Sequence, residues 1–245
     1  MAVKFTSDSK ILIVGGSSGM GLSLAKQSLD AGAKVIIVGR QTEKLNHAWE
    51  ALGQSARLST MNIDATQETD VARLFEEVGP LDHIVTTAAD IRGAYELLPD
   101  LDISAALRAV ESKVLAPILL AKYGAPKLRA GGSITFTSGI AAYRPSTRGT
   151  VVAAVNAALE GLVRALAVEL APLRVNAVSP GWVNTPIWTF VAGDRKAETL
   201  DAMASRLPVG RIGQAEDIAD AITFLMGNGF TTGTVLHVDG GHRLI

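Results

Sequence analysis

Seven short runs of apolar, often β-branched residues alternate with longer helical patterns along this chain of 245 residues. Most of these runs are nearly continuous in Val, Ile and Leu, which is typical of strands that helices cover on both faces of a parallel sheet. Strand–helix alternation of this kind favours right-handed crossovers and a doubly wound arrangement. The sequence therefore predicts a single α/β domain over residues 1–245, with a seven-stranded parallel sheet flanked by helices.

The expected elements follow from these patterns. The predicted strands are residues 10–14, 34–38, 56–59, 82–86, 133–138, 174–179 and 234–238. The predicted helices are residues 19–31, 42–51, 67–77, 101–128, 151–171 and 215–226. Pro117 lies in the fourth predicted helix and is expected to kink it or end it early. Residues 181–213 are the longest irregular stretch, and we expect the part at about 182–212 to cover a substrate site.

Composition excludes several classes of function. The formal net charge of −1 gives no indication of a nucleic-acid partner. The chain has no Cys, which excludes disulfides, thiolate metal ligands and cysteine nucleophiles. The four histidines, His47, His83, His237 and His242, show no paired metal-ligand spacing, so we predict no metal site.

Two segments were compared with a secretory signal and with a membrane-spanning helix, and neither has the expected composition. The amino terminus has too few apolar residues for a secretory signal in its sequence MAVKFTSDSK. The longest apolar stretch, residues 151–171, contains two Glu, an Arg and Asn156, so it is interpreted as a buried helix and not as a membrane span. We therefore expect a cytoplasmic protein that has no membrane partner.

A glycine-rich turn follows the first predicted strand directly and opens the first predicted helix. Its residues are Gly15, Gly16, Ser17, Ser18, Gly19, Met20 and Gly21. Glycine permits the tight turn and lets phosphates approach the backbone. The amides that open the helix then face a diphosphate, with the positive end of the helix dipole behind them. The strand, turn and helix together predict a Rossmann-type site for a dinucleotide.

The end of the second predicted strand indicates which dinucleotide. An NAD site places an acidic residue there, whereas an NADP site places an arginine. Here the strand ends at Arg40, and this strand end has no carboxylate to repel a 2′-phosphate. Arg40 can bind that phosphate in a bidentate, charge-assisted contact, and Ser17 and Ser18 can add hydroxyl donors. The alternative is an arginine that only faces solvent; its position favours NADP(H).

With these motifs the chain resembles the short-chain dehydrogenase/reductase family. The family's opening pattern Thr-Gly-x-x-x-Gly-x-Gly corresponds to residues 14–21, with Val14 in place of the threonine. Residues 174–185 resemble the sixth strand and its Pro-Gly turn, and the tail resembles the family at residues 210–213 and 238–241. The matching motifs run from about residue 10 to residue 242.

The resemblance implies further cofactor contacts. Asp64, after the third predicted strand, would accept a hydrogen bond from the adenine amine. Thr185 and the backbone of Val183 would hold the nicotinamide carboxamide. The other cofactor-binding residues that the resemblance suggests are Ala88, Asn156, Pro180 and Gly181.

Every member of the family's usual catalytic set is altered. The family reduces a carbonyl with a Tyr-x-x-x-Lys pair, whose lysine lowers the pKa of the tyrosine, together with a serine and an asparagine. These positions hold Val152 for the tyrosine, Asn156 for the lysine, Gly139 for the serine and Lys113 for the asparagine. The family's Asn-Asn-Ala-Gly is replaced by Thr86, Thr87, Ala88 and Ala89.

The catalytic candidates are therefore Lys113, Ser138 and Tyr143. Lysine and asparagine have exchanged helices, so Lys113 can supply the positive charge near the ribose, with Asn156 as a neutral hydrogen-bonding partner. The alternative is unlinked drift, with Lys113 extending to solvent. Ser138 adjoins the family's serine position. Tyr143 follows the fifth predicted strand and can donate a proton, although packing or a surface contact explains a loop phenol more simply.

Two further patterns concern the substrate and the assembly. Bulky apolar residues at 186–192 suggest a lid over a largely apolar small molecule, or else packing or a subunit contact. The helices at 101–128 and 151–171 resemble the family's four-helix dimer interface, which implies a homodimer or homotetramer. We predict an NADP(H)-dependent oxidoreductase acting on a carbonyl or alcohol. The alternative is an NADP(H)-binding sensor or scaffold protein without turnover.

Overall fold

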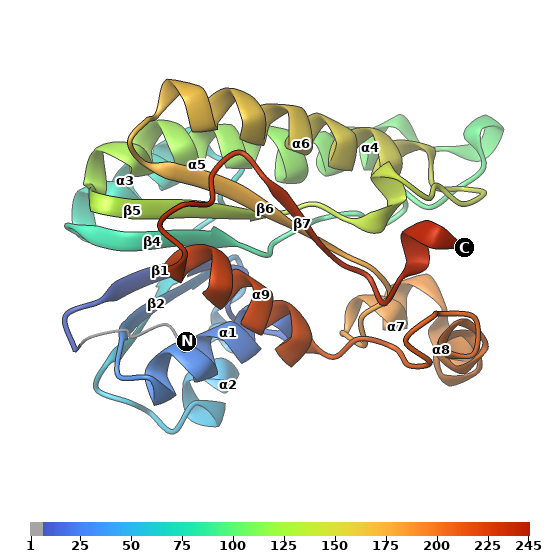
Figure 1. Cartoon of the computed structure of the whole chain (residues 1–245), viewed down its shortest axis with the longest axis horizontal. Helices are drawn as coiled ribbons and strands as arrows, with labels where there is room; N and C mark the ends of the chain where they lie inside the picture. Colours follow the sequence, from blue (N-terminus) through green and yellow to red (C-terminus); the bar gives the residue numbers. More distant parts are fainter. Residues whose placement is uncertain (1–6) are drawn as a thin grey trace.

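A seven-stranded parallel sheet forms the centre of the molecule, which confirms the predicted fold class (Figure 1). The computed structural model describes residues 7–245; residues 1–6, part of the segment in which no secretory signal is expected, lie outside the described residues. The strand order is β3-β2-β1-β4-β5-β6-β7. The strands are β1 Lys10–Val14, β2 Lys34–Gly39, β3 Leu58–Asn62, β4 Leu81–Thr86, β5 Leu128–Thr137, β6 Arg174–Pro180 and β7 Val235–Val238.

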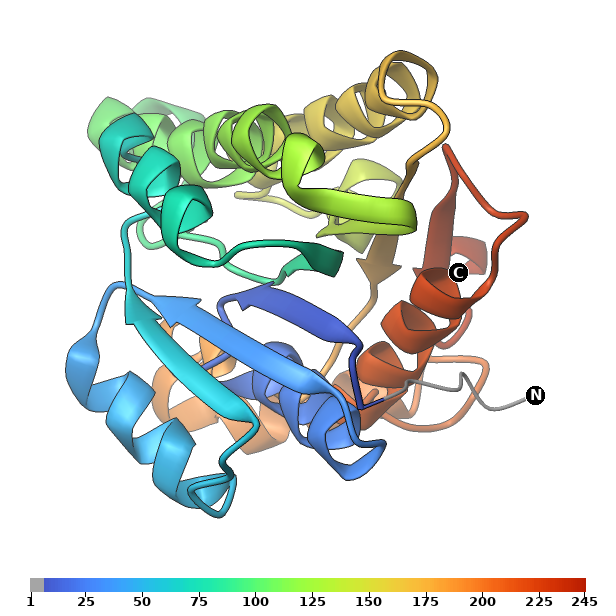
Figure 2. The ribbon, with the colours of Figure 1, turned by 90° about the vertical axis from the view of Figure 1, so that its left-hand side faces the viewer.

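Helices cover both faces of the sheet (Figures 1 and 2). The main helices are α1 Gly19–Asp30, α2 Thr42–Ala51, α3 Glu68–Glu77, α4 Ile103–Val110, α5 Ala116–Gly124, α6 Thr150–Glu169, α7 Ile187–Val191, α8 Lys196–Ala204 and α9 Ala215–Gly227. One layer contains α3, α4, α5 and α6, and the other contains α1, α2 and α9. The short helices α7 and α8 lie in the long segment between β6 and α9, as expected for the irregular stretch.

Alternation along the strands builds two cores, one on each face. In β1, Leu12 and Val14 join the apolar cluster under α3, α5 and α6. Ile11 and Ile13 join the cluster against α1, α2 and α9. Successive strand side chains point to opposite faces, so a run that is apolar at every position must be covered on both sides.

The strand order reverses between β1 and β4. The chain winds outward from β1 through β2 to β3, and then returns to place β4 on the other side of β1. Ligands of doubly wound sheets bind outside the carboxyl ends of the strands at such a switch point. The glycine-rich turn after β1 lies at this place.

The fourth predicted helix is not α-helical throughout, and its predicted end was wrong. It divides into α4, a π-helical turn at Glu111–Leu115 and α5, and β5 already begins at Leu128. Pro117 lies in the first turn of α5, directly after the π-helical turn, and the helix continues beyond it to Gly124. The third strand also begins and ends later than predicted, at Leu58–Asn62, because its register follows β2.

Helix α6 is the one helix in residues 7–245 whose length and apolar composition would suffice to cross a membrane. It packs on the sheet through Leu159 and Val163. Its polar residues Asn156 and Glu160 are buried as well. The interpretation as a core helix therefore fits the structure.

His83 gives the fold a pH dependence. It lies buried on β4, with Nδ1 2.9 Å from the hydroxyl oxygen of Ser133. Burial, and secondarily the charge of Arg174, lowers the pKa of His83 to about 4. The unfolded chain therefore binds a proton at a higher pH than the folded chain does, so the contribution of His83 to stability is present above pH about 6.5 and is lost on acidification.

We predict that the free energy of unfolding falls by up to about 3 kcal/mol between pH 6.5 and pH 4 because of this residue. Urea unfolding of the wild-type chain and of His83→Gln across this range measures the effect. The variant should show a weaker dependence on pH. His47→Gln, which changes an exposed histidine on α2, is the control and should follow the wild type. Equal pH dependence in all three chains would contradict the prediction.

Candidate active site

The turn between β1 and α1 packs backbone against backbone. Gly15 has φ +88°, and a Cβ there would lie 2.7 Å from the amide nitrogen of Ala88. A Cβ at Gly21 would lie 2.3 Å from the carbonyl oxygen of Gly15. Neither position has room for a side chain, so the turn presents a bare backbone surface, which suits a diphosphate.

The first turn of α1 leaves donors available for an anion. Its first helical hydrogen bond runs from the amide of Leu22 to the carbonyl oxygen of Ser18, so the amides of Gly19, Met20 and Gly21 have no helical acceptor. Ser18 is the N-cap residue, but its side chain makes no capping hydrogen bond. The predicted phosphate-facing residues are therefore placed together with free donors.

The segment after β6 lies beside this turn. A Cβ at Gly19 would lie 3.4 Å from Cγ2 of Thr185. Pro180 ends β6, and Gly181 fits so closely against Asp239 that a Cβ would lie 2.7 Å from its Cα. Val183 forms a parallel bridge with Gly213. The residues predicted for the nicotinamide end thus approach the opening of α1.

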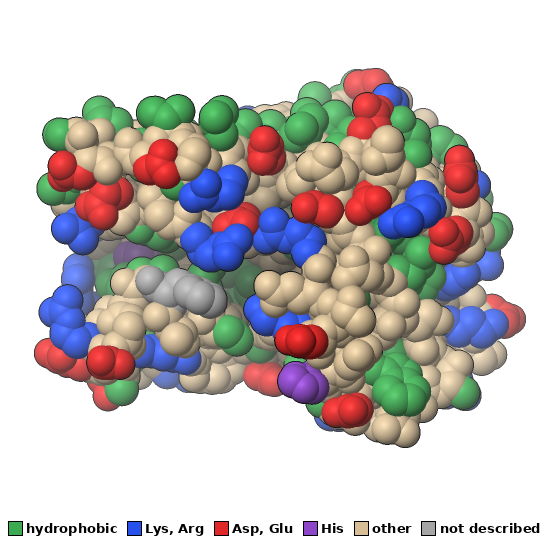
Figure 3. All heavy atoms as spheres, turned by 180° about the vertical axis from the view of Figure 1, so that it is seen from behind, with side chains coloured by type: hydrophobic (Ala, Val, Ile, Leu, Met, Phe, Trp, Pro, Cys, Tyr) green, Lys and Arg blue, Asp and Glu red, His purple; other side chains and the backbone are tan. Residues whose placement is uncertain are grey.

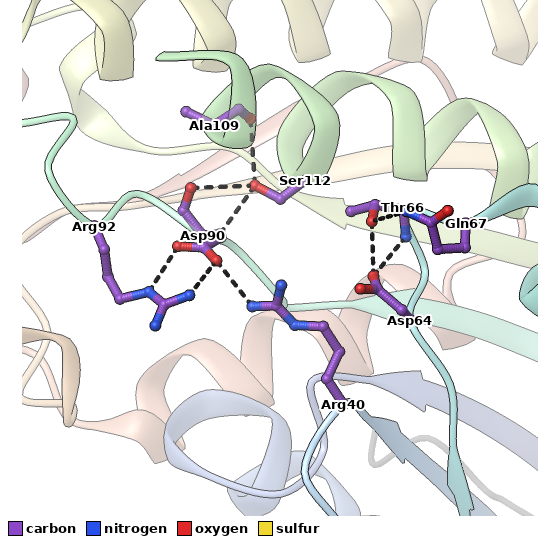
Figure 4. Close-up of polar contacts among 8 residues, drawn as sticks. All are labelled: Arg40, Asp64, Thr66, Gln67, Asp90, Arg92, Ala109 and Ser112. Carbon is purple, nitrogen blue, oxygen red and sulfur yellow. Dashed lines mark hydrogen bonds and ion pairs between the residues drawn. The ribbon is translucent and has the colours of Figure 1, made fainter. Parts of the chain in front are cut away.

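Arg40 has a carboxylate neighbour that does not come from the end of β2. Its guanidinium Nη2 lies 3.0 Å from Oδ2 of Asp90, a residue fifty positions later (Figure 4). Arg92 binds the same carboxylate in a bidentate contact, with distances of 2.9 and 2.6 Å. The bonds from Arg92 and Arg40 hold the pKa of Asp90 below its usual range, although burial acts in the opposite direction. No local pattern indicates Asp90, because it is distant from β2 in the sequence and reaches Arg40 only in the folded chain. Ser17 lies near Gly39, the residue before Arg40, because a Cβ at Gly39 would be 3.6 Å from the Ser17 hydroxyl oxygen.

Asp64 uses one carboxylate oxygen locally. Its Oδ1 accepts hydrogen bonds from the amide and the hydroxyl of Thr66, at 3.0 and 2.8 Å (Figure 4). Its main-chain amide donates to Asp70. Asp64 is therefore held in a turn between β3 and α3, and its Oδ2 has no hydrogen bond among the described residues, so it remains able to accept one from an adenine amine.

Lys113 is buried and does not extend to solvent, so that alternative is wrong. It lies in the π-helical turn, and its ammonium donates to the carbonyl oxygens of Thr137 and Ser138 at 2.5 and 3.2 Å. Burial lowers the pKa of Lys113 to about 8, while the charge of Glu160 opposes the shift. The structure thus holds an ammonium at the carboxyl end of β5.

Ser138 and Tyr143 meet at a residue that was not predicted for the site. Both hydroxyls donate to the carboxylate of Glu160, at 2.8 Å from Ser138 and 2.5 Å from Tyr143. Desolvation and the bond to Glu160 raise the pKa of Tyr143 to about 12. The signal that could have found Glu160 is its position one helical turn after Asn156 within an otherwise apolar stretch.

The altered positions fit one another. A Cβ at Gly139 would lie 2.8 Å from Nδ2 of Asn156, so the asparagine amide lies where a side chain at Gly139 would begin. The Oδ1 of Asn156 is buried without a hydrogen-bond partner. Val152 belongs to a separate apolar cluster with Ala94, against which Tyr95 packs.

The bulky residues after β6 mainly pack on each other. Trp188 stacks on Trp182 with ring centroids 4.4 Å apart, and its Nε1 donates to the carbonyl oxygen of Val183. Both rings pack against an apolar cluster from α8 and the segment that follows it. The structure therefore gives Trp188 a packing role in this segment; the side chain of Phe190 lies outside the described residues.

The histidines at this end of the sheet pack against aromatic rings. His237 lies edge-on to Tyr143, with ring centroids 4.5 Å apart, and His242 lies edge-on to Trp182. Within residues 7–245, no three His, Asp or Glu side chains form a group that could hold a metal ion.

Comparison with known proteins identifies the family. A family model described as Enoyl-(Acyl carrier protein) reductase matches residues 14–243. The short-chain dehydrogenase/reductase ATR9 of Stachybotrys chlorohalonatus is 36% identical over 249 residues, which cover 94% of this chain and 95% of that protein. The solved structure of MalC Reductase/Diels-Alderase from Malbranchea aurantiaca has a TM-score of 0.89 and 33% identity, with 97% of each chain covered. A small-chain dehydrogenase in complex with NADPH has a TM-score of 0.82 and 34% identity, over 97% of this chain and 100% of the other. Since these matches span nearly the whole chain, this protein belongs to the short-chain dehydrogenase/reductase family of oxidoreductases.

Proposed function

We propose that this protein is an NADP(H)-dependent oxidoreductase that interconverts a carbonyl and an alcohol on a largely apolar small molecule. The observation that carries the proposal is the buried ammonium of Lys113 at the carboxyl end of β5. It keeps a cation among positions whose usual catalytic residues are replaced. The similar small-chain dehydrogenase solved with NADPH supports the choice of cofactor.

The residues present fit a dinucleotide. The side-chain-free turn at Gly15 and Gly21 would take the diphosphate, together with the amides that open α1. Arg40 would bind a 2′-phosphate on the adenosine ribose. The unpartnered Oδ1 of Asn156 would accept a hydrogen bond from the ribose beside the nicotinamide. When bound, the cofactor supplies or accepts the hydride of the reaction.

Lys113 would donate the proton when a carbonyl is reduced. With a pKa of about 8, its ammonium is mostly protonated at neutral pH and still able to give up a proton, which is the condition for effective acid catalysis. The positive charge also stabilises negative charge that develops on a substrate oxygen. The carbonyl oxygens of Thr137 and Ser138 fix the ammonium in position.

The alternative function is an NADP(H)-binding sensor or scaffold without turnover. Val152 favours it, because this residue stands where the family has its tyrosine and lies in an apolar cluster. The two functions share the cofactor site. They differ in whether any carbonyl is reduced when NADPH is bound.

We also propose that copies of this chain pair through the layer of α4, α5 and α6. Apolar side chains lie along the upper edge of the molecule over this layer (Figure 3). The exposed apolar residues of α4 and α5 are, for example, Ile103, Leu107 and Ile118. A homodimer or homotetramer would cover them.

We predict that Lys113→Met lowers kcat by about 10²-fold or more, because it removes the proposed acid. NADPH binding, measured by calorimetry, should change much less. Single-turnover assays with NADPH and a panel of apolar carbonyl compounds provide the rate. Lys122→Met, which changes an exposed lysine on α5, is the matched control and should keep the wild-type rate.

The pH profile adds a second readout to this test. In the direction of reduction, the wild-type rate should fall as the pH rises above about 8, because the ammonium loses its proton. Wild-type binding of NADPH with no turnover of any compound would favour the sensor. Turnover by Lys113→Met at the wild-type rate would contradict the role of the lysine.

Tyr143→Phe tests the other candidate donor. If Tyr143 gives up the proton, this change lowers turnover by about 10²-fold or more. Because the hydroxyl donates to Glu160 and its pKa is raised, we expect a much smaller effect than for Lys113→Met. The same single-turnover assay compares the two variants. A larger loss in Tyr143→Phe would exchange their proposed roles.

Cofactor preference has its own test in Arg40→Asp. The change replaces a cation that would attract the 2′-phosphate by an anion that repels it. We expect weaker binding of NADPH and unchanged binding of NADH in calorimetry. Equal weakening of both nucleotides would indicate that Arg40 supports the fold of the site and does not recognise the phosphate.

A further inference from the structure

We propose that Arg92 is a specificity-determining residue for NADP(H), because it neutralises Asp90 and so leaves the charge of Arg40 available for the 2′-phosphate. The inference rests on the proposed function and deepens it. It concerns the charge cluster formed by Arg40, Asp90 and Arg92, which come from the end of β2 and from the segment after β4 (Figure 4).

The carboxylate at the centre of this cluster is nearly inaccessible. Only 4% of the Asp90 side chain is exposed, compared with 47% for Arg40 and 59% for Arg92. Arg92 engages both carboxylate oxygens, whereas Arg40 engages one of them. The two guanidinium groups therefore cover the carboxylate and remain accessible to a ligand themselves.

Asp90 cannot readily move aside to make room for a phosphate. Its main-chain amide donates to the hydroxyl oxygen of Ser112 at 2.9 Å. Ser112 itself belongs to the π-helical turn and approaches the carbonyl oxygen of Ala109. The carboxylate is thus a fixed negative charge at the place where a 2′-phosphate would approach Arg40.

The sum of charges explains why a second arginine is needed. Asp90 is ionised, because the hydrogen bonds from Arg92 and Arg40 hold its pKa below the usual range. With both arginines the cluster carries a net charge of +1. Without Arg92, Arg40 would be the sole counter-ion of Asp90, and the cluster would be neutral. A phosphate dianion would then meet no net attraction there.

The place of the cluster identifies the anion. Ser17, in the turn that would hold the diphosphate, lies near Gly39, next to Arg40. A phosphate bound at Arg40 is therefore adjacent to the diphosphate site on its adenosine side. This matches a dinucleotide that carries an additional phosphate on the adenosine ribose. NADH has only hydroxyls there and gains much less from the net positive charge, because its diphosphate is farther from the cluster than a 2′-phosphate would be.

Calorimetric binding of NADPH and of NADH to Arg92→Gln, Asp90→Asn and the double variant tests the inference. We expect Arg92→Gln to raise the Kd for NADPH about tenfold, because it removes one nearby positive charge. The Kd for NADH should change by less than about twofold, because NADH has no 2′-phosphate. In the Asp90→Asn background, the same Arg92 substitution should have a smaller effect on NADPH, because no carboxylate is left to compete with the phosphate for Arg40 and only the loss of one positive charge remains. This reduction of the effect is the signature of charge coupling between the two residues.

Arg129→Gln is the matched control. Arg129 is similarly exposed and pairs with Asp82, at the opposite end of β4 from Asp90. It should bind NADPH as the wild type does. Arg92→Lys, which keeps the charge, should retain most of the affinity and guards against a variant that fails to fold.

Two outcomes would overturn the inference while the proposed function stands. In the first, the wild type prefers NADPH but Arg92→Gln weakens both nucleotides alike, which indicates a structural role. In the second, Arg92→Gln binds NADPH as tightly as the wild type does. A wild-type chain that binds neither nucleotide would instead overturn the proposed function, and the inference with it.

Discussion

The backbone contact between the β1–α1 turn and the segment after β4 is the constraint on which the site depends. The amide of Gly15 donates to the end of β2, and the amide of Thr87 donates to the end of β1, so three neighbouring strands end together. The hydroxyl of Thr87 also donates to the carbonyl oxygen of Gly15, where a side chain at Gly21 would collide. This contact holds the glycine turn against the segment that carries Asp90. The proposed diphosphate site and the charge cluster therefore keep a fixed relative position.

The π-helical turn at Glu111–Leu115 joins the two ends of this site. Its Ser112 accepts a hydrogen bond from the amide of Asp90, and its Lys113 donates to the end of β5. Neighbouring residues of one turn therefore contact the proposed phosphate end and the proposed catalytic end. Such turns replace the regular α-helical spacing over a few residues and often occur at functional sites. The turn also lies directly before Pro117, which is in the first turn of α5.

Local patterns were enough to predict the sheet, the helical layers and the glycine turn, because apolar runs and glycine spacing act through neighbouring residues. The charge cluster could not be predicted in the same way. Asp90 reaches Arg40 only after the β1–β4 reversal brings residues fifty positions apart together. Lys113 lies in a π-helical turn that no residue pattern predicts, and the sequence shows Glu160 only as a polar position in an apolar helix. In each case the missing information is a long-range contact or a local deviation from regular geometry.

The altered catalytic positions are linked by space and charge, which argues against independent drift. The amide of Asn156 lies where a side chain at Gly139 would begin, so the two positions depend on each other. Asn156 is neutral, and the cation of the site comes instead from Lys113. A buried ammonium costs several kcal/mol unless partners compensate it. Lys113 has two carbonyl acceptors and the nearby charge of Glu160, whose carboxylate is itself satisfied by Ser138 and Tyr143. A protein that had lost its catalytic acid would gain nothing from keeping such a charge buried. This network therefore favours the proposed oxidoreductase over the binding protein without turnover.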